Sequence, residues 1–227
     1  MRIADKLQAT ENLIKFWRLI LATILRPLSY QYQWLYDGIS RLAALAVGGE
    51  TRFRQLALEG LKIAKNDPIL DLCCGAGQTT RYLVPLSDHC TGLDVSPVAL
   101  ERASLAVPQA HYVGGLAEKM PFNAAEFAFV HTSAALHEME PEQLEEILKE
   151  VYRVLRPGGI FALVDFHRPT NPLFWPSLAL FLQLFETDTA WQFIDRDLIR
   201  SLQAIGFRDC QQKLYAGGSL QVIQAAK

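Results

Sequence analysis

A glycine-containing turn and a carboxylate downstream of it are the residues of this chain best suited to hold a ligand. Gly75 and Gly77 follow the apolar run 68–72, and Asp94 lies at the end of the next apolar run, 23 residues after Asp71. Glycine lets the backbone approach a ligand closely, and an acid at the tip of the second strand can accept hydrogen bonds from both hydroxyls of a ribose. A glycine turn alone often only packs a helix on a strand, but the turn and the acid together predict a site for a nucleoside-containing cofactor.

Two known phosphate-binding motifs are absent from this turn, which excludes the cofactors that they bind. A nicotinamide dinucleotide site would show a third glycine, which eases packing of the following helix, but Thr80 stands at that position. No Gly-Lys-Ser or Gly-Lys-Thr follows the turn, which excludes a P-loop.

The elements that must position these residues alternate between strand and helix. Strands are expected at 68–73, 89–95, 110–113, 126–131 and 159–166. Helices are expected at 78–84, 97–105 and 141–155, the last with apolar residues on one face and glutamates on the other. This alternation predicts a mostly parallel sheet covered by helices on both faces, with ligands bound outside the carboxyl ends of the strands.

Composition bounds the class of protein. The chain has 227 residues, a formal net charge of −2, 50% apolar residues and 20% charged residues. These values exclude a generically basic nucleic-acid binder and a disordered chain, and the length suits one domain with a small appendage. Two of the four cysteines are adjacent and two stand alone, so no metal-ligand spacing exists and a reducing, intracellular compartment is the simplest interpretation.

The apolar excess is concentrated in two segments. Residues 13–28 predict a basic amphipathic helix, and residues 1–30 carry five basic and two acidic side chains, a local charge of +3. Such a helix could lie at a membrane surface, or it could pack across the domain over the cofactor site or a dimer interface. The uncharged run between Arg18 and Arg26 is seven residues long, which is too short to span a bilayer.

The second apolar segment, residues 169–185, contains no charged side chain. Its three prolines argue against a straight spanning helix. A buried helix, a lid over an apolar pocket and a lipid contact all remain open.

Four motifs in this order resemble class I S-adenosylmethionine-dependent methyltransferases. Residues 69–77, Ile-Leu-Asp-Leu-Cys-Cys-Gly-Ala-Gly, look like motif I, and Asp94 matches the ribose-binding acid. Residues 117–122 resemble the adenine-binding segment, and residues 155–159 resemble the turn before strand five. The resemblance covers roughly residue 60 to the C-terminus. It implies a Rossmann-like, seven-stranded, mostly parallel sheet with helices on both faces, formed by residues 51–227, and an N-terminal helical extension, residues 1–50, that covers the cofactor.

The resemblance implies S-adenosylmethionine as the cofactor, S-adenosylhomocysteine as the product, and no metal. Two positions depart from the pattern: Cys73 replaces the first glycine of motif I, and Leu116 replaces an acid that holds the adenine. Adenine would then rest on the backbone of Leu116 and Ala117 and on stacking by Val95. The residues expected to contact the cofactor are Asp71, Cys73, Gly75, Ala76, Gly77, Asp94, Val95, Leu116, Ala117, Glu118, Thr132 and Ser133.

Within this superfamily the chain is most similar to the quinone C-methyltransferases of menaquinone, phylloquinone and ubiquinone synthesis. The Cys-Cys-Gly form of motif I resembles plant and cyanobacterial phylloquinone enzymes, Tyr36-Asp37 resembles their N-terminal segment, and residues 215–223 resemble their last hairpin. The resemblance implies methyl transfer to a ring carbon of a prenylated quinol. Another apolar acceptor (a tocopherol precursor, sterol, lipid or polyketide) and a non-catalytic, membrane-associated cofactor-binding protein are the alternatives.

A ring-carbon acceptor must lose a phenolic proton, so a base or an electrostatic partner would help. His137, which follows the fourth expected strand, is the leading candidate, followed by Asp37 and then Asp165. His137 could instead bond backbone or cap the turn before the next helix, Asp37 could cap a helix, and Asp165 could be structural. Acceptor contacts are expected from Tyr36, His137, Phe174 and Trp175.

The partners follow from these expectations. We expect a small apolar acceptor, no nucleic acid, and a cytoplasmic protein with a peripheral membrane contact as an open alternative. A homodimer is also open.

Overall fold

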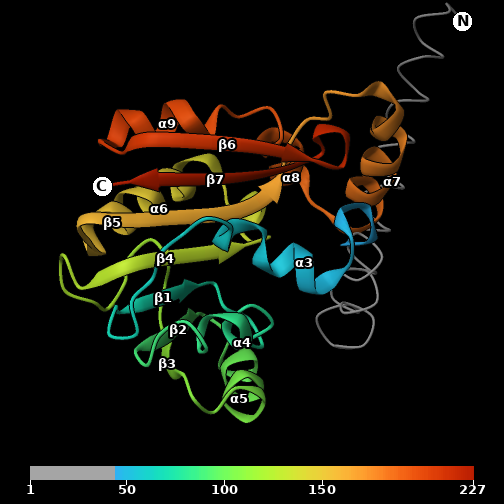
Figure 1. Cartoon of the computed structure of the whole chain (residues 1–227). Helices are drawn as coiled ribbons and strands as arrows, with labels where there is room; N and C mark the ends of the chain where they lie inside the picture. Colours follow the sequence, from blue (N-terminus) through green and yellow to red (C-terminus); the bar gives the residue numbers. More distant parts are fainter. Residues whose placement is uncertain (1–43) are drawn as a thin grey trace, which may run out of the picture.

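The computed structural model of the chain describes residues 44–227, without the side chains of Leu184 and Phe185. Tyr36, Asp37, the amphipathic segment 13–28 and most of the expected extension 1–50 lie outside the described residues. Seven strands form one sheet in the order β3-β2-β1-β4-β5-β7-β6 (Figure 1). Of these seven strands, β7 runs in the direction opposite to the other six and pairs antiparallel with both β5 and β6. The strands are β1 (Ile69–Leu72), β2 (Cys90–Asp94), β3 (His111–Gly114), β4 (Phe127–Ser133), β5 (Leu155–Phe166), β6 (Arg208–Tyr215) and β7 (Leu220–Ala226).

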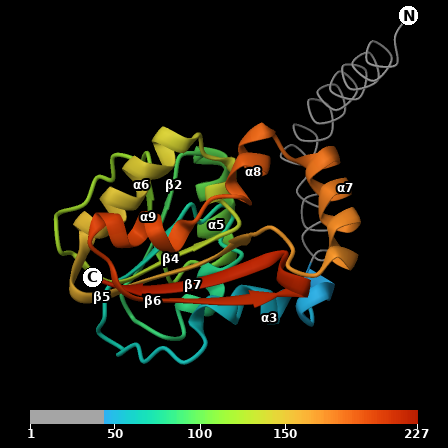
Figure 2. The ribbon, with the colours of Figure 1, turned by 90° about the horizontal axis from the view of Figure 1, so that it is seen from above.

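Helices cover both faces of this sheet. Helices α6 and α9 lie together on one face, while α3 and η2 lie on the other, with η2 against β5 and β7 (Figure 2). Helix α4 contacts β1 and β2, and α5 contacts β2 and β3. The α-helices are α3 (Glu50–Gln55), α4 (Thr80–Leu83), α5 (Pro97–Ala106), α6 (Pro141–Val154), α7 (Trp175–Phe185), α8 (Asp188–Phe193) and α9 (Leu198–Ile205). The 3-10 helices are η1 (Leu45–Val47), η2 (Leu56–Leu58), η3 (Leu136–Glu138), η4 (Pro172–Phe174) and η5 (Ala216–Gly218).

The structure confirms the expected Rossmann-like, mostly parallel sheet and moves two element boundaries. Helix α4 begins at Thr80 rather than at residue 78, because the turn that contains Gly75 and Gly77, with φ of 54° and 80°, continues through Thr79. Strand β5 begins at Leu155, so the expected turn at 155–159 belongs to the strand, with a register shift against β4 between Phe127 and Phe129.

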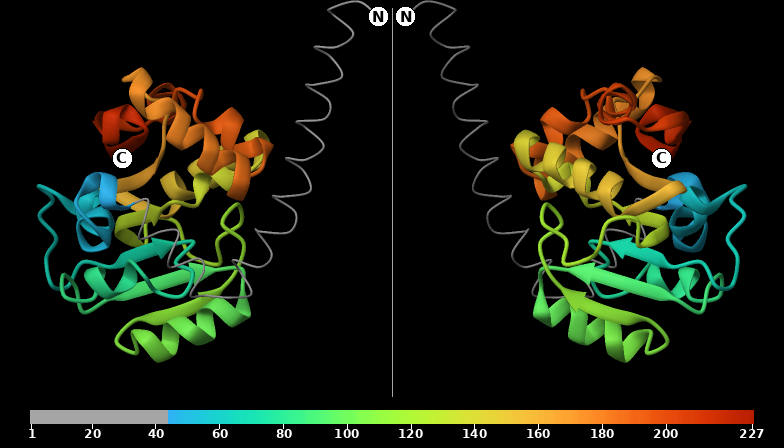
Figure 3. Two further views of the ribbon diagram at one scale, coloured as in Figure 1. Left: turned by 90° about the vertical axis from the view of Figure 1, so that its right-hand side faces the viewer. Right: turned by 90° about the vertical axis from the view of Figure 1, so that its left-hand side faces the viewer.

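The apolar segment 169–185 forms η4 and α7. The side views of Figure 3 show α5 and β3 at one end of the sheet and the helices and strands of the C-terminal part at the other. Within residues 44–227, no helix combines the length and apolarity that crossing a membrane requires.

The core divides into two layers because side chains alternate along each strand. In β5, Phe161 and Leu163 join the cluster that α6 and α9 cover, whereas Ala162 and Val164 join the cluster beneath η2. This two-sided burial fixes the register, and the register places the carboxyl ends of β1, β2, β4 and β5 along one edge.

The register of β2 requires glycine at position 92. A Cβ there would lie 2.8 Å from Cys74 Sγ and 2.8 Å from Tyr112 Cδ1. We predict that Gly92→Ala lowers the free energy of unfolding by about 1–3 kcal/mol, because the surrounding side chains must shift, as measured by urea denaturation. Gly114→Ala is the matched control, since its Cβ would meet only Leu100 Cδ1 at 3.7 Å. Equal effects of the two substitutions would contradict this account of Gly92.

Candidate functional site

The glycine turn and Asp94 meet at the carboxyl edge of the sheet. The N–H of Gly75 donates to Asp94 Oδ2 at 2.9 Å, and the N–H of Ser96 donates to Oδ1 at 2.9 Å. Ser96 in turn caps α5, because its Oγ accepts from the N–H of Ala99 at 3.3 Å. Strands β1 and β2 are parallel neighbours, so residues that follow each of them come together there. The two features on which the cofactor prediction rests are therefore adjacent.

Asp71 supports this turn from below. Its carboxylate accepts from Thr80 Oγ1 at 2.6 Å and pairs with His131 Nδ1 at 3.0 Å, and all three side chains are buried. The β1–β4 register places Asp71 directly beside His131. The carboxylate of Asp71 is turned to these two partners, and its expected contact with the cofactor stays a prediction. The sequence reasoning missed the role of Thr80, although its place at the start of the helix after the turn was a signal for it.

Cys73 occupies a left-handed conformation, with φ of 56°. A residue with a Cβ pays roughly 1 kcal/mol there, which explains in physical terms why glycine is usual at this position of motif I. Burial raises the pKa of the thiols of both Cys73 and Cys74. Both side chains are therefore neutral thiols at neutral pH rather than reactive thiolates.

Two apolar side chains stand exposed beside Asp94. Val95 is 67% exposed and Leu116 is 48% exposed. The N–H of Gly115 donates to the carbonyl of Asp94 at 3.1 Å, which holds the Leu116 loop at the end of β2. Exposed apolar groups near a carboxylate that is expected to bind a ribose suit a flat, apolar base. The contacts of Ala76, Ala117 and Glu118 with the cofactor remain predictions.

The end of β4 adds polar groups to the same edge. Among the described residues the buried hydroxyl of Thr132 has no hydrogen-bond partner, and Ser133 Oγ accepts from Arg54 Nη1 at 3.5 Å. Arg54 comes from α3, is buried, and was not singled out from the sequence. This donor set, together with Asp94 and the exposed apolar pair, fits a cofactor with a ribose, a base and a polar tail.

His137, Asp165 and Glu186 form a buried cluster beyond β4 and β5. His137 Nδ1 lies 2.6 Å from Asp165 Oδ1, and His137 Nε2 lies 3.4 Å from Glu186 Oε2. Asp165 also accepts from the backbone N–H groups of Leu136 at 2.9 Å, of His137 at 3.3 Å and of Phe166 at 2.8 Å. The sequence reasoning named His137 and Asp165 separately and missed Glu186.

The charge of this cluster decides what His137 can do. Burial lowers the pKa of His137, but the adjacent carboxylates of Asp165 and Glu186 outweigh it and hold the pKa well above its ordinary value of 6.5. The imidazole is therefore a cation at neutral pH, with both N–H groups directed at carboxylates. In this arrangement both ring nitrogens of His137 face carboxylates, and its role as a general base stays a prediction.

Phe174 and Trp175 take part in packing. The ring of Phe174 covers Gly217, where a Cβ would lie 2.1 Å from Phe174 Cδ2. The ring of Trp175 packs edge-on against Trp191 with centroids 6.1 Å apart, and the Arg168 guanidinium lies 5.2 Å from the Trp175 centroid. Their contact with an acceptor remains a prediction.

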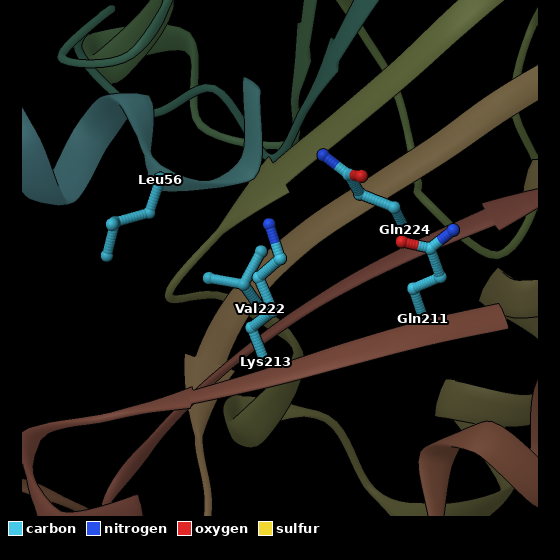
Figure 4. Close-up of a pocket in the computed structure, with 5 residues that line it drawn as sticks. All are labelled: Leu56, Gln211, Lys213, Val222 and Gln224. Carbon is cyan, nitrogen blue, oxygen red and sulfur yellow. The ribbon is translucent and has the colours of Figure 1, made fainter. Parts of the chain in front are cut away.

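A small hollow lies on the other half of the sheet, away from Asp94. It opens between η2 and the β6–β7 hairpin (Figure 4). Its lining residues are Leu56, Gln211, Lys213, Val222 and Gln224. Across residues 44–227 no group of three or more His, Cys, Asp or Glu side chains could hold a metal ion.

Comparison with known proteins identifies similar sequences. A family model described as "Methyltransferase domain" matches residues 69–159. An uncharacterized methyltransferase of Synechocystis is 60% identical over 205 residues, which are 90% of this chain and 97% of that protein. A demethylmenaquinone methyltransferase of Mycolicibacterium gilvum is 28% identical, over 85% of this chain and 93% of that protein. A 2-phytyl-1,4-naphtoquinone methyltransferase of Thermosynechococcus vestitus is 30% identical, over 69% of this chain and 70% of that protein.

A solved structure shares the fold. The S-adenosylmethionine-dependent methyltransferase from Archaeoglobus fulgidus superposes with a TM-score of 0.65 at 14% identity. The match covers 86% of this chain and 100% of that one.

The position of Asp94 generates a test of the cofactor site. We predict that Asp94→Ala weakens binding of S-adenosylmethionine about tenfold or more, because hydrogen bonds from the ribose hydroxyls to a charged acceptor are lost. Isothermal titration measures the change. Glu101→Ala, at an exposed glutamate of α5, is the control and should bind as the unaltered chain does. Unchanged affinity of a folded Asp94→Ala variant would refute the ribose role.

Proposed function

Because this chain belongs to the class I S-adenosylmethionine-dependent methyltransferases, we propose that it transfers the methyl group to a ring carbon of a prenylated quinol. The methyltransferase activity follows from the family. The acceptor is the proposal, since the relative with the highest identity among those described above has a name that specifies no acceptor. Two more distant relatives, named for demethylmenaquinone and for a phytyl naphthoquinone, support a quinol acceptor.

The observation that carries the proposal is the position of α7. This helix contains no charged residue and is the first α-helix after β5, at the edge to which the arrowheads of β1, β4 and β5 point in Figure 1. Leu173, just before it, is 81% exposed, and Leu180 within it is 60% exposed. An apolar surface beside the cofactor edge suits an acceptor with a long hydrocarbon tail better than it suits a polar one.

Different residues of the chain would bind different parts of the cofactor in such a reaction. Bound S-adenosylmethionine supplies an electrophilic methyl group on a sulfonium. Asp94 would bind the ribose, and the turn at Gly75 would let the cofactor approach the backbone closely. Val95 and Leu116 would flank the adenine. With these groups fixed, the main tasks left to the protein are to align the acceptor and to exclude water.

The proton balance of the reaction needs a base. The acceptor loses its phenolic proton, a ring carbon forms a bond to the methyl carbon as the S–C bond breaks, and the ring carbon then loses its hydrogen as a proton. His137 is a paired cation in the described arrangement, and its role as that base stays a prediction. Asp37, which lies outside the described residues, stays a proposed candidate.

An acceptor screen tests the proposal. We expect transfer of a labelled methyl group to reduced demethyl-naphthoquinols that carry a prenyl or phytyl tail, with mass spectrometry placing the methyl group on a ring carbon. Tocopherol precursors, sterols and phospholipids serve as comparison acceptors. Transfer to one of these and to no quinol would overturn the acceptor assignment and leave the methyltransferase activity intact.

We further propose a peripheral membrane contact, because a prenylated acceptor resides in the bilayer. The basic amphipathic segment 13–28 and the exposed Leu173 and Leu180 support it. Deletion of residues 1–28 should reduce sedimentation with anionic liposomes more than it reduces turnover of a short-chain, water-soluble quinol. Equal sedimentation of the two chains would instead favour a helix that packs on the domain.

A further inference from the structure

Residues 168–194, here called the α7–α8 cap, have an apolar core of their own. Leu178, Leu182, Ala190 and Ile194 are buried together, apart from the two clusters that line the sheet. Aromatic rings surround them, among them Trp175, Trp191 and Phe181. At the end of α8, Phe193 is buried in the cluster that α6 and α9 cover, so α8 is packed on the domain. The position of α7 depends on a few contacts at its two ends.

One tie lies at the beginning of the cap. The N–H groups of Thr170 and Asn171 both donate to the carbonyl of Gly217, at 3.0 Å and 2.9 Å. The ring of Phe174 closes over the same glycine. These contacts fix the cap to the β6–β7 turn, beyond the N-terminal end of α7.

The second tie lies at the far end of α7. Glu186 follows the last residue of the helix, and its carboxylate meets His137 Nε2 at 3.4 Å. The Phe166 ring at the end of β5 packs between the two parts, 4.5 Å from the His137 ring and 5.4 Å from the Phe181 ring, centroid to centroid. The Glu186 side chain is 12% exposed, so this charged bond is largely shielded from water.

The tie is anchored rigidly on the domain side. Asp165 holds His137 Nδ1 at 2.6 Å and is itself fixed by backbone N–H groups of η3 and β5. Loss of the Glu186 carboxylate would leave a buried imidazolium N–H without its acceptor, which is costly. The cluster therefore favours the arrangement in which the end of α7 stays against the loop that follows β4.

We propose that Glu186 is a positioning residue for the acceptor: by bonding His137 across the α7–α8 junction, it holds the apolar helix α7 at the edge where the methyl group is transferred. This inference rests on the proposed function. Glu186 acts through His137 and α7 and needs no contact with the acceptor. Its effect should fall on the binding of the acceptor's hydrocarbon tail, because the cofactor groups at Asp94 and Gly75 belong to other strand ends.

The kinetic test uses Glu186→Ala and the conservative Glu186→Gln, with Glu140→Gln as the matched control at an exposed glutamate just beyond η3. We expect Glu186→Ala to raise KM for a long-tailed quinol about tenfold, the effect of losing one charged hydrogen bond, and Glu186→Gln to raise it less. The KM for a tail-less quinol and the affinity for S-adenosylmethionine should stay as in the unaltered chain. Equal KM changes for both quinols, or no change for either, would overturn the positioning role.

A second measurement is independent of the acceptor. Hydrogen exchange of the α7 amides, followed by mass spectrometry, should be faster in Glu186→Ala than in the unaltered chain and unchanged in Glu140→Gln. Unchanged exchange in Glu186→Ala would overturn the tie itself. If the unaltered chain methylates no quinol, the proposed function fails, and this exchange experiment still decides whether Glu186 holds the cap.

Discussion

The Asp94 carboxylate is the contact on which the geometry of the cofactor edge depends. One oxygen accepts from the turn after β1 and the other from the residue that caps α5, so a single side chain joins two strand ends and a helix start. Both bonds use backbone N–H groups, which makes them insensitive to the identity of the donating residues. A carboxylate that is held from one side in this way presents its remaining lone pairs in a fixed direction. A ribose would meet a preformed acceptor and would not have to order it.

Two buried Asp–His pairs flank β4 and have different partners. Asp71 pairs with His131 beneath the glycine turn, and Thr80 ties the same carboxylate to the start of α4. Asp165 pairs with His137 beyond the strand end, and there the second ring nitrogen meets another carboxylate. The first pair stabilises a turn within the sheet layer. The second connects separate segments, since it joins the loop after β4, the end of β5 and the end of α7.

The sequence reasoning succeeded where function follows from position on a strand. The places of Gly75, Gly77 and Asp94 could be predicted because residues that follow parallel neighbouring strands must meet at one edge. It also identified Cys73 as a departure, and the left-handed backbone at that position supplies the reason. Asp71 lies in β1, just before this turn, but its side chain is buried in the layer, and its place in the strand did not predict that direction.

The contacts that escaped prediction join segments whose distance apart depends on tertiary packing. Glu186 reaches His137 only because α7 folds back over the end of β5, and no local pattern in residues 169–185 specifies that path. Arg54 reaches Ser133 for a similar reason, since α3 precedes the whole sheet in the chain. Side chains at the ends of irregular or apolar helices therefore needed the structure before their partners could be named.

The separate apolar core of the α7–α8 cap affects how substitutions could accumulate in this fold during evolution. Substitutions among Leu178, Leu182 and Ala190 repack a cluster that is distinct from the two layers against the sheet. Effects of mutations in separate clusters tend to add rather than to interfere. Selection could therefore reshape the acceptor side of such an enzyme step by step, while the cofactor side kept the packing that its strand ends require.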